Sequence, residues 1–133
     1  PEALEAARWL AGRLGMRAIE VSGDRRLYHA SAVIAGNFAT VLLAEAARVL
    51  AAAGVPLEDA PGLLAPLALQ SLRNAVLDGP AASLTGPVAR GDEGTLQGHR
   101  EALVEAGLAD VLALYEPLTA AARRLVSPGS SEV

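Results

Sequence analysis

The sequence predicts an all-α protein, a helical bundle preceded by one helix and one strand. Two observations lead to this fold class. Hydrophobic residues make up 52% of the 133 residues but aromatic residues only 3%, so the apolar content is mostly Ala and Leu, which favour helices. Apolar residues also recur at helical spacing in runs that begin at Asp or Pro and end at Gly. The length suits about one domain.

Composition excludes several classes of protein. The chain has no Cys, which rules out a disulfide framework, a thiol nucleophile and a zinc site built on sulfur. The formal charge of −4 argues against a nucleic-acid partner, which usually meets a basic surface. All 11 basic residues are Arg, so this chain supplies no lysine for Schiff-base chemistry.

The first 23 residues predict a helix and a strand. Residues 2–14 form an amphipathic pattern that ends at Gly15, and residues 17–21 alternate polar and apolar. One strand cannot form a sheet alone. It pairs either with a symmetry mate or with a sheet in an upstream domain. We favour the upstream domain, so we expect this chain to be the C-terminal piece of a larger protein.

A long helix is predicted over residues 25–53, capped by Asp24 and closed by Gly54. Residues 27–44 carry no formal charge, so a membrane span must be considered. Polar residues within that stretch, and Arg48 after it, favour a helix buried centrally or in an interface instead.

The remaining residues predict three more helices. One covers residues 57–77, with Pro61 in its first turn and Pro66 expected to kink or delay it, and a loop follows over residues 81–91. Asp92 is expected to cap a helix that ends near Ala106. Asp110 is expected to cap the last, which runs to about Val126 with a bend at Pro117. We therefore assign residues 24–126 to the helical domain and expect residues 127–133 to be a disordered tail.

His29 and Asn37 are the first candidate site residues. They lie eight residues apart on the long helix, which gives an angular offset of about 80° and places them on roughly the same side, two turns apart. A His donates a proton or hydrogen bond to a carbonyl oxygen, and an Asn amide orients a substrate. The alternative is a His bonded to nearby backbone and an Asn at a tight helix crossing beside Gly36.

The predicted loop over residues 81–91, before the helix capped by Asp92, supplies the second candidates, Thr85 and Arg90. A Gly-containing loop with these side chains, leading into a helix N-terminus, suits an anion. Asp92 opposes this because its carboxylate stands where the anion would sit. A structural turn with Arg90 paired to an acid is the alternative. His99 has no second His at ligand spacing, so we expect no metal site.

Two segments resemble a known family. They are YHASAVIAGN at positions 28–37 and LTGPVARGD at positions 84–92. The family is domain-of-unknown-function family 2520, whose members carry a helical C-terminal domain behind a Rossmann-like, NADP-oxidoreductase-type domain. The resemblance covers nearly the whole chain from about Arg17. It implies that residues 1–23 are the last helix and strand of the Rossmann-like part.

The resemblance also implies a fold and a role. The fold would be similar to the C-terminal domains of 6-phosphogluconate dehydrogenase, pyrroline-5-carboxylate reductase and ketopantoate reductase, which close a substrate cleft and usually build a dimer. His29 looks like the occupant of a position that is Lys in several such enzymes, and Asn37 resembles an Asn two turns on. Val33 departs from the pattern, since that position is often Asn.

Two functional hypotheses remain open. The first is the substrate-cleft and dimerisation domain of an NAD(P)-dependent oxidoreductase, with His29 and Asn37 catalytic, and Thr85 and Arg90 binding a small carbonyl or imine substrate. NADP would be bound mainly by the upstream domain, and the isolated piece would be inactive. The second is a non-catalytic helical dimerisation module. Under both we expect a cytoplasmic homodimer with no nucleic-acid or membrane partner.

Overall fold

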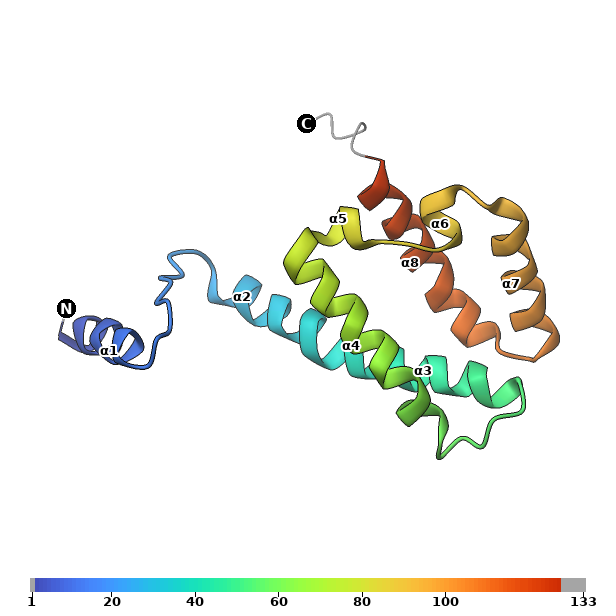
Figure 1. Cartoon of the computed structure of the whole chain (residues 1–133), viewed down its shortest axis with the longest axis horizontal. Coiled ribbons are helices and arrows are strands. Elements are labelled where there is room, and N and C mark those ends of the chain that lie inside the picture. Colours follow the sequence, from blue (N-terminus) through green and yellow to red (C-terminus); the bar gives the residue numbers. More distant parts are fainter. Residues whose placement is uncertain (1, 128–133) are drawn as a thin grey trace. The chain divides into compact units, whose positions relative to one another are not determined.

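The structure is a computed structural model that describes residues 2–127 (Figure 1). All regular structure in this range is helical, which confirms the predicted fold class. The described residues fall into two compact units, with the boundary between Ala39 and Thr40. Each unit is described by itself.

The first unit begins with α1 (Glu2–Arg13), as the sequence predicts. The helix ends at Gly15, which has a φ of 66°, and the Met16 amide donates to the Ala11 carbonyl at 2.8 Å. The strand predicted over residues 17–21 is absent, because this segment has no regular structure. The physical reason is that the amides and carbonyls of a strand need a neighbouring strand to pair with, and residues 2–127 offer none.

One continuous helix then runs from Arg25 to Ala52. It comprises α2 (Arg25–Ala32), a π-helical segment η1 (Val33–Phe38) and α3 (Ala39–Ala52). The Asp24 carboxylate accepts from the Arg26 amide at 2.8 Å, so the predicted N-cap is confirmed. Gly54, with a φ of 99°, follows the other end as predicted.

This helix differs from the prediction in two respects. A π turn interrupts it where an uninterrupted α-helix was expected. It is also largely exposed within the chain, with Ala47 its one buried residue, so central burial was wrong and the interface alternative stays open. By length and composition alone, it is the one helix in the described range that could cross a membrane, a test that core helices of soluble proteins also pass.

The second unit contains α3 together with five further helices. They are α4 (Ala60–Asp78), α5 (Pro80–Ser83), α6 (Pro87–Arg90), α7 (Glu93–Glu105) and α8 (Ala109–Val126). Helix α8 packs against α5, α6 and α7 (Figure 1). The buried apolar side chains in the described residues are few and all aliphatic: Ala47, Ala60, Leu96, Leu103 and Val111.

Several predicted boundaries in this unit need correction. The loop expected over residues 81–91 contains the two short helices α5 and α6, each of which begins with a proline that suits a first helical turn. Helix α4 starts at Ala60 rather than residue 57 and continues through Pro66, as α8 does through Pro117. The predicted disordered tail covers residues 127–133, and all of it except Ser127 lies outside the described residues.

The two predicted aspartate caps have different outcomes. Asp92 caps α7 as predicted, accepting from the Thr95 amide at 3.0 Å. Asp110 does not cap α8, because the N-cap position is Leu108 and no side chain bonds there. Its carboxylate instead accepts from Arg48 of α3 at 2.7 Å, an ion pair that joins two helices distant in the sequence.

Candidate functional site

His29 lies on the exposed surface of α2. It lines an open hollow of about 460 Å³ together with Arg25, Arg26, Tyr28 and Ala30. Its ring nitrogens make no hydrogen bond to any residue within 2–127, whereas the neighbouring Arg26 is held by Asp24 at 2.6 Å. The imidazole is therefore exposed and has no hydrogen-bond partner among the described residues.

Asn37 lies in the π-helical segment η1 and is also exposed. A π turn closes on i→i+5 hydrogen bonds, so each residue advances by a smaller angle than in an α-helix. The offset of about 80° expected between His29 and Asn37 is therefore reduced. The π segment brings the two side chains closer to a common face, although Asn37 does not line the hollow beside His29.

Thr85 and Arg90 lie at opposite ends of α6. Thr85 precedes Gly86, whose φ of 90° is the left-handed conformation that favours glycine, and Arg90 is the last residue of the helix. Both side chains are exposed, and no ion pair holds Arg90 within the described range. The expected alternative, Arg90 paired to an acid, is therefore not formed; its guanidinium interacts with Asp92 only through charge at longer range.

Asp92 is engaged as a helix cap rather than as an anion-site group. Its carboxylate accepts from the Thr95 hydroxyl at 2.7 Å as well as from the Thr95 amide, and these hydrogen bonds lower the pKa of Asp92 from its usual 3.8. A carboxylate at this position disfavours a second anion at the same helix end.

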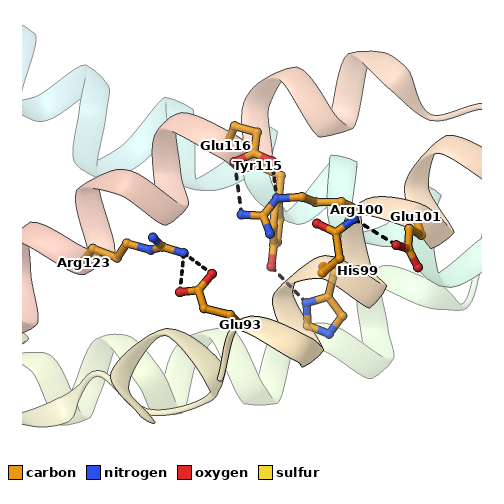
Figure 2. A network of polar contacts seen from close by, with 8 residues as sticks. Glu93, His99, Arg100, Glu101, Tyr115, Glu116 and Arg123 are labelled. Carbon is orange, nitrogen blue, oxygen red and sulfur yellow. Dashed lines mark hydrogen bonds and ion pairs between the residues drawn. The ribbon is translucent and has the colours of Figure 1, made fainter. Parts of the chain in front are cut away.

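A polar pair that the sequence analysis missed joins α7 to α8. His99 Nδ1 lies 2.9 Å from the Tyr115 hydroxyl, with the two rings edge to face (Figure 2). Nearby, Arg100 donates to Glu116 at 2.6 Å and Arg123 to Glu93 at 2.7 Å. The partners in these pairs are 16 or 30 residues apart in the sequence, so no local sequence pattern predicts them.

No group of three potential metal-ligating side chains occurs within residues 2–127. No curated protein and no solved structure gives a significant match to the chain. One family model does match, over residues 1–122, and its description is "Domain of unknown function (DUF2520)". Because that match covers most of its length, the chain belongs to the DUF2520 family.

Proposed function

We propose that this chain is the substrate-cleft and dimerisation domain of an NAD(P)-dependent oxidoreductase that reduces a small carbonyl or imine. One observation carries the proposal. An exposed His29, without a hydrogen-bond partner in the described chain, shares a helix with Asn37, which lies in a π segment. Such π segments occur frequently at functional sites.

The chemistry assigns a role to each residue. The protonated His29 imidazole would give its proton to the oxygen or nitrogen of the substrate as the double bond is reduced. The Asn37 amide would orient that group. Arg90, which has no ion-pair partner within 2–127, suits a substrate carboxylate because guanidinium binds it in bidentate fashion. Thr85 would add a hydroxyl donor.

The cofactor would be NADP, which in its reduced form, NADPH, supplies the hydride when bound. This sequence has no strand followed by a Gly-rich turn and a helix, the arrangement that holds a dinucleotide. A separate nucleotide-binding domain would therefore bind NADP, and the helical domain alone would be inactive.

The test uses the intact, full-length protein. NADPH consumption would be followed with a panel of 2-keto acids and cyclic imines. For a general acid, the His29→Gln variant should lower kcat roughly a hundredfold and remove the corresponding limb of the pH profile. Ser31→Ala, a substitution of an exposed residue on the same helix, is the matched control and should leave kcat unchanged.

Two results would refute this role. If the intact protein does not bind NADPH, the oxidoreductase proposal fails. If the His29→Gln variant turns over as fast as the Ser31→Ala control, His29 is not the proton donor.

A second candidate, a non-catalytic dimerisation module, is favoured by the exposed apolar surface of α4. Leu69, Leu72 and Val76 share one stripe of this helix at helical spacing, and they are between 57% and 85% exposed. Large apolar stripes of this kind mark association surfaces.

Sedimentation tests this candidate. If α4 forms the dimer interface, Leu72→Glu together with Val76→Glu should convert a dimer to a monomer. Arg73→Glu, a charge change on the same helix, is the control. The α4 interface is refuted if the double variant sediments like the unsubstituted protein.

A further inference from the structure

A second cavity lies entirely within the second unit and contains none of the four proposed substrate residues. It is a groove of about 650 Å³ lined mainly by α3, α7 and α8, with Leu64 of α4 also among the lining residues. This volume is within the range of small-molecule sites. Its lining residues run from Leu42 to Leu118 along the chain.

The groove is apolar apart from three side chains. The apolar lining comes mainly from Ala and Leu, including Ala46, Leu103 and Leu114. The polar members are Glu45, His99 and Tyr115. A mostly apolar cavity with a few convergent polar groups is the usual composition of a ligand pocket.

The His99–Tyr115 pair leaves a hydrogen-bond donor for a ligand whichever way its own bond runs. If the Tyr115 hydroxyl donates to His99 Nδ1, the proton of the neutral imidazole is on Nε2, which has no partner within residues 2–127. If Nδ1 donates to the Tyr115 oxygen, the hydroxyl proton remains free. In both arrangements one N–H or O–H of this lining pair remains free for an acceptor oxygen.

Charge in the groove favours a neutral ligand. Glu45 is its one formally charged lining residue, and its carboxylate is already bonded to Arg48, which also holds Asp110 at 2.7 Å. No arginine is among the lining residues, so an anionic head group would meet a carboxylate and no counter-charge. A cationic ligand would have to compete with Arg48 for Glu45.

We infer that this groove binds a neutral, largely apolar molecule with one carbonyl-type acceptor oxygen, which accepts a hydrogen bond from the His99–Tyr115 pair. The inference does not rest on the oxidoreductase role, because it uses none of the residues assigned to that reaction. The two can therefore fail separately.

Benzophenone is a suitable probe because it is neutral and apolar, has one carbonyl oxygen and forms covalent adducts with nearby C–H bonds when irradiated. The chain would be irradiated over a range of benzophenone concentrations and the adducts located by mass spectrometry. Saturable labelling of groove residues in α3, α7 and α8 is expected. Diphenylmethane, which lacks the carbonyl, should compete several-fold less well than fluorenone, which retains it.

Two variants and one control sharpen the test. Ala46→Trp fills the groove and should reduce its labelling at least tenfold, whereas Ala44→Trp, on the same helix but outside the lining, should not. Replacing both His99 and Tyr115 by Phe keeps the apolar volume but removes the donor. The half-saturating concentration should then rise roughly fivefold, the usual effect of one hydrogen bond. Far-UV circular dichroism confirms that each variant is folded.

Four results would each overturn the inference. Labelling could fall mainly on the exposed leucines of α4 or fail to saturate. The Ala46→Trp variant could be labelled like the original chain. Groove labelling could also decline as rising protein concentration drives association, which would show that a second copy covers the groove. If Ala46→Trp does not fold, the positions of the adducts on the unsubstituted chain still show whether the probe binds in the groove.

Discussion

Leu96 is the largest side chain that the described residues bury completely, with 0% exposure, and truncating it should severely destabilise the second unit. Leu96→Ala removes three carbon atoms, worth about 2.4 kcal/mol at about 0.8 kcal/mol each. The cavity left behind raises the expected loss of unfolding free energy to about 3 kcal/mol.

Urea unfolding followed by far-UV circular dichroism measures this loss. For a domain of this size, about 3 kcal/mol lowers the melting temperature by roughly 12–24 °C. The control is Leu67→Ala, the same substitution at a side chain that is 67% exposed and lies outside the apolar stripe of Leu69, Leu72 and Val76. It should change the unfolding free energy by less than about 0.5 kcal/mol. Equal losses in the two variants would show that Leu96 is not a core residue and that the packing described here is wrong.

Two further predictions concern the helix ends. Gly107→Ala should lower the unfolding free energy by about 1 kcal/mol because φ there is 72°. Gly98→Ala, inside α7 with open space around it, should raise the unfolding free energy by roughly 0.5–1 kcal/mol. If urea unfolding shows both variants shifted in the same direction, this prediction is refuted. Asp92 and Asp110 have folded pKa values below their usual 3.8, owing to Thr95 and Arg48 respectively. The stabilisation by these two carboxylates is present above about pH 4 and is lost as the pH falls through their folded pKa values. Replacing both residues by Asn should therefore make the unfolding free energy decline less steeply between pH 5 and about pH 2. A decline as steep as that of the unsubstituted protein would contradict this prediction.

The ends of the helices were predictable because capping is a local interaction. Asp24 and Asp92 accept from amides two and three residues ahead, and Gly15 and Gly54 follow helix ends with positive φ values. These features need only neighbours in the sequence, so the residue types reveal them. The failure at Asp110 shows the limit of that argument. The same residue type at the same kind of position bonds instead to Arg48, 62 residues away.

The candidate site also has some features that the sequence predicts and others that only the structure reveals. The sequence placed His29 and Asn37 on one helix, and the structure adds the π segment that narrows the angle between them. The sequence of that segment, VIAGNF, contains no proline or other pattern that distinguishes a π turn from an α-helix, so no local signal predicts the π turn. The pairing of His99 with Tyr115 likewise requires α7 and α8 to pack together.

The sequence by itself determined that this protein is helical, where capping aspartates or terminal glycines mark the ends of α1, α2, α3 and α7, and which polar residues stand on its long helix. These properties follow from hydrophobic periodicity and from contacts within one helical turn. Only the tertiary structure decided which side chains are buried, that residues 17–21 form no strand, and that an apolar groove lies beside His99 and Tyr115. Those features arise from contacts between residues distant in the chain, and periodicity along one segment carries no information about its partners.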